Sequence, residues 1–164
     1  DQRLFHPIHV ATQSVLQALR LGKVSCGLVP LAFSCLRVLA DTDTEHWGFI
    51  QENNLELVAE VLEEHEGDEN VQEEGLALLA TAAVQPAAAD QIFRNGGFKA
   101  ALRAVEVFVE CQSVVRQLLA LFLNCATVKK LGEEMIRVGT LRATLACLQM
   151  HSEDLEVVRF VLDI

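Results

Sequence analysis

The chain has 164 residues with a formal net charge of −10 at pH 7, and 51% of its residues are hydrophobic. A chain of this length can bury one substantial core, so we expect a single domain. Nucleic acids and anionic membranes are poor candidates as partners, because a strongly acidic protein repels both. Leu, Ala and Glu favour helices and only three Pro interrupt the chain, so the composition predicts an all-α protein.

In chain order, apolar periodicity first predicts a helix over residues 28–40. Three units follow, and in each a short first helix leads to a second helix and then to a long, apolar third helix. The predicted ranges are 43–52, 55–63 and 71–83, then 86–95, 98–109 and 114–127, then 129–138, 141–150 and 157–164. Pro86 suits the first turn of its helix, and we expect Thr140 and Ser152 to be N-caps.

The three units repeat with a period of 43 residues. Residues of the same kind recur at this spacing, as in the sets Leu55/Phe98/Leu141, Leu62/Val105/Leu148, Val71/Val114/Val157 and Leu76/Leu119/Leu162. One period earlier, Leu19, Leu28, Phe33, Cys35 and Leu36 extend the pattern to the amino-terminal residues. We therefore divide the chain into a partial repeat (1–41), two full repeats (42–84 and 85–127) and a truncated repeat (128–164), and expect it to be a piece of a longer protein.

The predicted third helices are apolar around most of their circumference, as in LALLATAA and LLALFLNCA. Such helices have to be buried between neighbours, which stacked units provide. The turn between the first and second helices carries Gly96–Gly97 in one unit and Gly139 in the next. Glycine suits a sharp reversal because it permits positive φ, so we interpret this stretch as a turn that marks each repeat.

A short helix followed by two longer ones, with a period near 42, is the pattern of armadillo repeats. The segment FIQENNLELVAEVLEEHEGDENVQEEGLALLATAA resembles such a repeat in its opening turn and in the later Val71–Gln72 and Leu78–Leu79. The segments 86–127 and 129–164 are similar. The resemblance implies a right-handed α-solenoid whose third helices line a concave groove, and it is specific for fold but not for function.

In the armadillo family, an asparagine near the end of the third helix hydrogen-bonds the backbone of an extended bound peptide. The corresponding positions here are Val38, Thr81 and Asn124, of which only Asn124 matches. The resemblance therefore implies a groove with these candidate partner-binding residues: Ser34, Val38, Glu74, Ala77, Thr81, Gln117, Ala120, Asn124 and Phe160. The groove either receives an extended or helical segment of a partner or is a neutral surface, since only some repeats of a long array bind. The tryptophan ladder of nuclear-import adaptors is missing, since Trp47 falls in a predicted first helix, and this argues against an import adaptor.

Residues 60–74, EVLEEHEGDENVQEE, contain eight acidic side chains. One interpretation is a docking patch for a basic segment of a partner. The other is a solvated turn in which Asp68 and Glu69 stabilise the amino end of the following helix.

The sequence carries no recognisable catalytic motif, and its cysteines and histidines lack the spacing of metal ligands. We therefore expect no enzymatic activity, no metal and no cofactor. The five cysteines are expected to be free thiols, several of them buried, in a cytoplasmic protein.

Together these features favour a non-catalytic protein-interaction or scaffolding module with a protein or peptide partner. The alternative is a regulatory or assembly domain that packs against a kinase-like or other catalytic domain of the same parent protein. Apolar Phe160, Val161 and Ile164 lie in a last helix with no following unit. They predict continuation of the array, a capping segment or self-association through the open end.

Overall fold

The computed structural model describes residues 2–21, 26–42 and 54–164. Within these ranges every regular element is a helix, which confirms the all-α prediction. The amino-terminal part contains α1 (Gln2–Arg20), a short 3₁₀ turn (Cys26–Leu28) and α2 (Val29–Thr42). The remainder contains α4 (Leu55–Glu64), α5 (Glu69–Ala82), α6 (Pro86–Arg94), α7 (Gly97–Phe108), α8 (Gln112–Ala126), α9 (Lys129–Arg137), α10 (Thr140–Met150) and α11 (Leu155–Asp163).

The helix boundaries repeat as the sequence predicts. The third helices α5, α8 and α11 begin at Glu69, Gln112 and Leu155, which are 43 residues apart in each step. Each begins two residues before the predicted apolar stripe. The first helices α6 and α9 begin at Pro86 and Lys129, again 43 residues apart. The predicted helix over 43–52, with Trp47, lies outside the described residues.

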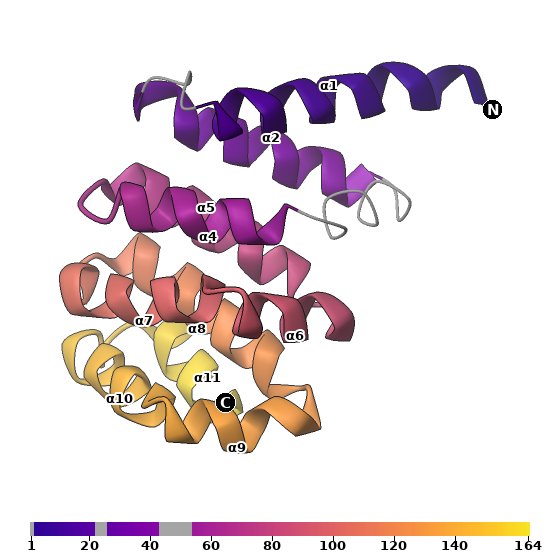
Figure 1. Cartoon of the computed structure of the whole chain (residues 1–164). Helices are drawn as coiled ribbons and strands as arrows, with labels where there is room; N and C mark the ends of the chain where they lie inside the picture. The colour runs from indigo at the N-terminus through magenta and orange to yellow at the C-terminus, as the bar shows by residue number, and fades with distance from the viewer. Residues whose placement is uncertain (1, 22–25, 43–53) are drawn as a thin grey trace.

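Helices in the same position of successive units stack on each other (Figure 1). Helices α2, α5, α8 and α11 pack one against the next, and we call them the third-helix row. Helices α1, α4, α7 and α10 make a parallel series of contacts, which we call the second-helix row. Helix α6 packs against α4, α7 and α8 and so connects both rows. The fold is therefore a two-layered stack of helical repeats.

The core lies between neighbouring members of the third-helix row. Its central residues recur at the repeat spacing, and all of the following are fully buried: Phe33, Leu76 and Leu119 at one position, and Leu36, Leu79 and Phe122 at another. The last copy differs, since Leu162 follows Leu119 in the pattern but is 79% exposed. The same apolar position is thus core or surface according to whether another helix covers it.

Two expectations for the amino-terminal partial repeat are wrong. Leu28 and Cys35 were placed at apolar repeat positions, but Leu28 is 54% exposed and Cys35 is also exposed. Leu28 ends the short 3₁₀ turn and lies before α2, whereas its counterpart Val71 lies inside α5 and is fully buried. The partial repeat therefore follows the 43-residue pattern in its core positions and departs from it at its edge.

The turns before α7 and α10 confirm the role predicted for glycine. Gly96 and Gly139 are the N-caps of α7 and α10, with φ of 92° and 97°. These are the only described residues with positive φ, so both turns depend on a conformation that other residues adopt at a cost. The N-cap predictions for Thr140 and Ser152 are wrong, because Gly139 caps α10 and Asp154 caps α11.

Gly75, in the middle of α5, marks the closest approach of the third-helix row to its surroundings. A Cβ atom at this position would lie 2.6 Å from Leu62 Cδ2 and 3.0 Å from Phe33 Cε2. Gly132, in the middle of α9, is the opposite case, since a Cβ atom there would meet nothing within 4 Å. Glycine is required at the first position by packing and is dispensable at the second.

Alanine substitutions at these two glycines should change stability in opposite directions. Gly75→Ala is expected to lower the free energy of unfolding by about 1–2 kcal/mol, because overpacking outweighs the better helix propensity. Gly132→Ala is expected to raise it by about 1 kcal/mol, because only the propensity changes. Urea unfolding followed by circular dichroism measures both. A Gly75→Ala protein more stable than Gly132→Ala would contradict the packing described for α5.

Candidate functional site

The nine candidate residues of the predicted groove all lie on the third-helix row. Ser34 and Val38 come from α2, Glu74, Ala77 and Thr81 from α5, Gln117, Ala120 and Asn124 from α8, and Phe160 from α11. Most of them are half-buried, while Val38 is 57% exposed and Ala77 is buried. They form a shallow series of small and polar side chains along neighbouring helices.

Three of the polar candidates are already bonded within the chain. The Glu74 carboxylate lies 3.3 Å from the Arg37 guanidinium of α2. The Thr81 hydroxyl donates to the Ala77 carbonyl at 2.8 Å. The Asn124 amide donates to the Ala80 carbonyl of α5, also at 2.8 Å. Glu74 and Asn124 therefore connect adjacent repeats.

Asn124 is the residue that the armadillo resemblance assigns to a bound peptide. In this structure one of its amide hydrogens is used by Ala80, across the interface between α8 and α5. Its second amide hydrogen and its side-chain carbonyl oxygen make no hydrogen bond with the described residues. Neighbouring Gln117 makes no side-chain hydrogen bond with them either, so its whole amide is available to a partner.

The acidic stretch 60–74 is largely committed to structure. Asp68 caps α5 by accepting hydrogen bonds from the backbone N–H groups of Asn70 and Val71, which confirms its predicted place at that helix end. Acidic side chains of this stretch also reach residues of neighbouring units. These contacts are Glu63 with Lys99, Glu66 with Arg103, Glu69 with the Cys111 thiol and Glu74 with Arg37. Much of the negative charge therefore joins repeats.

A polar cluster at the start of α8 and α11 was not predicted. Asp154 caps α11 and also accepts hydrogen bonds from Gln112 and from Arg116, whose guanidinium contacts Glu156 at 3.0 Å. The hydrogen bond from Gln112 is the main cause that lowers the pKa of Asp154 from 3.8 to about 2, with helix-end N–H groups and Arg116 acting in the same direction. This cluster joins the last two members of the third-helix row.

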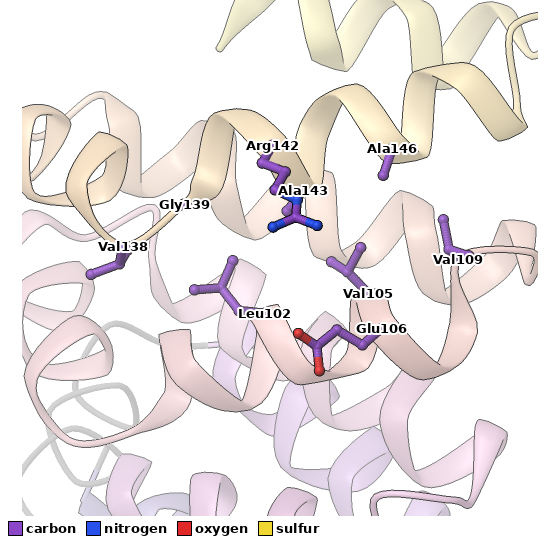
Figure 2. A pocket seen from close by; sticks show the side chains of 9 residues that line it. All are labelled: Leu102, Val105, Glu106, Val109, Val138, Gly139, Arg142, Ala143 and Ala146. Atoms are coloured by element: carbon purple, nitrogen blue, oxygen red, sulfur yellow. The ribbon is translucent and has the colours of Figure 1, made fainter.

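A second unpredicted feature is a cleft between α7 and α10 of the second-helix row (Figure 2). Its volume is about 410 Å³. Apolar side chains form most of its walls, and Arg142 on α10 and Glu106 on α7 approach it from opposite sides. The sequence did not predict this cleft, because the armadillo resemblance places all candidate residues on the third helices.

The end of the stack holds a smaller apolar pocket of about 290 Å³ between α9, α10 and α11. Val161 and Ile164, which the sequence placed at the open end, are among its lining residues. Thr140 and Thr144 also line it, and their hydroxyl groups are buried without a hydrogen-bond partner. The end face is therefore an apolar surface with unsatisfied polar groups beneath it.

The cysteines have different environments. Cys125 and Cys147 are fully buried, and burial raises the pKa of their thiols to about 12 and about 11. Both stay protonated at neutral pH and are poor nucleophiles. Cys111 is half-buried beside Glu69, and Cys35 is exposed. The side chain of Cys26 lies outside the described residues.

Within the described part of the chain, no group of three or more His, Cys, Asp or Glu side chains is placed to hold a metal ion. None of the described helices is long and apolar enough to cross a membrane. Comparison with protein-family models, curated proteins and solved structures gives no match.

The Asp154 cluster should make stability depend on pH below 4. The folded-state pKa of about 2 lies below the ordinary 3.8, so the ionised carboxylate favours the folded chain above pH 4. This contribution is lost as pH falls from about 4 to about 2. Asp154→Asn should therefore be less stable than the original chain at pH 5, and the difference should shrink towards pH 2. Urea midpoints across this range measure it, and a constant difference would contradict the assigned pKa.

Proposed function

We propose that the chain is a non-catalytic protein-interaction module of armadillo-like repeats, which binds a protein or peptide along the third-helix row. Two observations support an armadillo-like arrangement. The helix boundaries recur every 43 residues, and equivalent helices stack in two rows. Such an arrangement gives a rigid surface whose side chains recur at fixed spacing, which suits recognition of an extended segment.

The proposal rests mainly on two side-chain amides of α8 that have unused hydrogen-bonding groups. Gln117 presents an amide that makes no hydrogen bond within the described chain, and Asn124 retains one amide hydrogen and its oxygen on the same helix. Ala120 lies between them and is small, so a partner's backbone can approach closely. An extended peptide offers N–H and C=O groups that match these side-chain amides.

Charge favours a neutral or basic partner. The net charge of −10 attracts cationic segments over long range and raises their rate of association at low salt. The acidic stretch itself contributes less than its sequence suggests, because several of its carboxylates are paired within the chain. We therefore assign specificity to the third-helix row and assign only steering to the net charge.

The apolar end face favours a second candidate function. Ile136, Leu141 and Leu162 are 67%, 61% and 79% exposed around the last unit. A regulatory or assembly domain that packs against a catalytic domain of the same parent protein would use such a surface. The two functions predict different contact sites, so one experiment can separate them.

Site-specific photo-crosslinking in cells tests the proposal. A benzoylphenylalanine is placed at Gln117 on the third-helix row, at exposed Gln149 on the second-helix row as a matched control, and at Leu162 on the end face. We expect discrete adducts with a separate protein from position 117 and none from position 149. Adducts from position 162 alone would overturn the proposal in favour of the end-face function.

A loss-of-binding variant completes the test once an adduct is identified. Gln117→Ala should weaken capture of that partner by about fivefold or more, as expected for a central contact of an interface. Asn124 is unsuitable for this purpose, because its substitution also removes the bond to Ala80. Undiminished capture by a folded Gln117→Ala chain would contradict a role for this row.

A further inference from the structure

Two interfaces of the second-helix row, α4 with α7 and α7 with α10, have equivalent positions that can be compared residue by residue. Between α4 and α7, Lys99 lies 3.1 Å from Glu63, and Arg103 lies 3.7 Å from Glu66. Both ion pairs span the space between the two helices. Long charged side chains therefore lie across this interface.

One repeat later the same four positions hold different residues. Glu106 and Arg142 carry the same charges as Glu63 and Lys99. By contrast, Val109 stands at the position of Glu66 and Ala146 at the position of Arg103. Two long charged side chains are thus exchanged for two short apolar ones. The cleft of about 410 Å³ opens at this interface, and all four residues line it.

The remaining charges in the cleft are not joined to each other. Figure 2 shows the Arg142 guanidinium extending from α10 towards α7, with the Glu106 carboxylate on the α7 side. Neither forms an ion pair with a described residue, although Lys99 and Glu63 do so at the equivalent positions. A cation and an anion therefore face a cavity lined by apolar Leu102 and Val105.

We propose that this cleft binds a free α-amino acid with an apolar side chain. Its carboxylate would pair with Arg142, its ammonium group with Glu106, and its side chain would pack against Val105, Val109 and Ala146. Guanidinium and carboxylate groups form charge-assisted hydrogen bonds of the kind that orient such a ligand. The site lies on a different row from the third-helix surface and does not depend on the function proposed above.

The arrangement of charges selects this class of ligand over simpler ones. An apolar carboxylate would be attracted by Arg142 and repelled by Glu106, and an apolar amine would meet the reverse. A zwitterionic α-amino acid carries both charged groups on its α-carbon, beside its apolar side chain, so one ligand can pair with both Arg142 and Glu106. Because both protein charges are solvent-exposed, each contact contributes modestly, and we expect a dissociation constant of about 1 mM.

Titration of the methyl-labelled chain, followed by ¹H–¹³C NMR, tests the proposal with three probes of similar shape. L-leucine carries both charges, 4-methylpentanoate lacks the ammonium group, and 3-methylbutylamine lacks the carboxylate. We expect L-leucine to shift the methyl signals of Leu102, Val105 and Val109. Each analogue should bind about fivefold or more weakly, since it loses one ion pair and keeps one repulsive charge.

Variants assign the effect to the cleft. Arg142→Gln and Glu106→Gln should each weaken L-leucine binding about fivefold, which is the loss of one exposed ion pair. The matched controls Lys99→Gln and Glu63→Gln remove the same charges one repeat earlier and should leave binding unchanged. The double variant Val109→Glu/Ala146→Arg introduces the charged pair found at the α4–α7 interface. Its long side chains should fill the cleft and abolish binding while the far-ultraviolet circular dichroism stays the same.

Several outcomes would overturn the proposal. One is the absence of methyl shifts with L-leucine up to about 20 mM, far above the expected dissociation constant. Another is equal binding of all three probes, which would show that only the apolar walls matter. A third is shifts confined to the end pocket, at Val161 and Ile164, and a fourth is unchanged binding in the double variant.

Discussion

Burial of the third helices against one another is the interaction on which the rest of the structure depends. Phe33, Leu76 and Leu119 occupy one repeat position and are fully buried because a neighbouring unit covers each of them. Burying a side chain of this size contributes about 1.5–3 kcal/mol. A single unit leaves one of its apolar faces open, as the exposure of Leu162 at the same position illustrates. Stability therefore comes from the contacts between units and accumulates along the stack.

Polar contacts also join neighbouring repeats, and they define the relative position of the repeats more narrowly than apolar burial does. Asn124 reaches the Ala80 carbonyl across one interface, and Asp154 accepts hydrogen bonds from Gln112 and Arg116 across the next. Buried apolar contacts tolerate small slips, whereas hydrogen bonds require defined distances and angles. Several acidic side chains of the stretch 60–74, which the sequence suggested as a docking patch, thus form contacts between neighbouring repeats. Gln117 makes no such contact between repeats, and we therefore propose it as a binding residue.

The sequence predicted the features that depend on one residue type repeated at one spacing. Gly96 and Gly139 adopt positive φ at equivalent turns, as their shared position implies, and the buried positions of the third helices follow the 43-residue pattern. Features that depend on a distant partner were missed. Nothing adjacent to Asn124 in the sequence indicates that its amide would be taken by Ala80. In the same way, nothing adjacent to Asp154 indicates its hydrogen bonds with Gln112 and Arg116.

The cleft between α7 and α10 could be predicted from the sequence only in part. Two of its lining residues, Val109 and Ala146, occupy positions where the preceding repeat has Glu66 and Arg103. Its significance emerges only when the structure shows that Glu66 and Arg103 meet across the groove. The cleft that we propose as a binding site therefore coincides with a departure from the 43-residue repeat.

Native-state hydrogen exchange tests the central claim most directly, namely that contacts between units hold the fold together. Helices α5 and α8 are covered on both sides within the third-helix row, whereas α11 is covered on one side. The account predicts that core amides of α5 and α8 exchange only through global unfolding, while those of α11 exchange through local opening at lower free energy. Equal protection of α11 and α8 would show that each unit is stable by itself and would contradict the account.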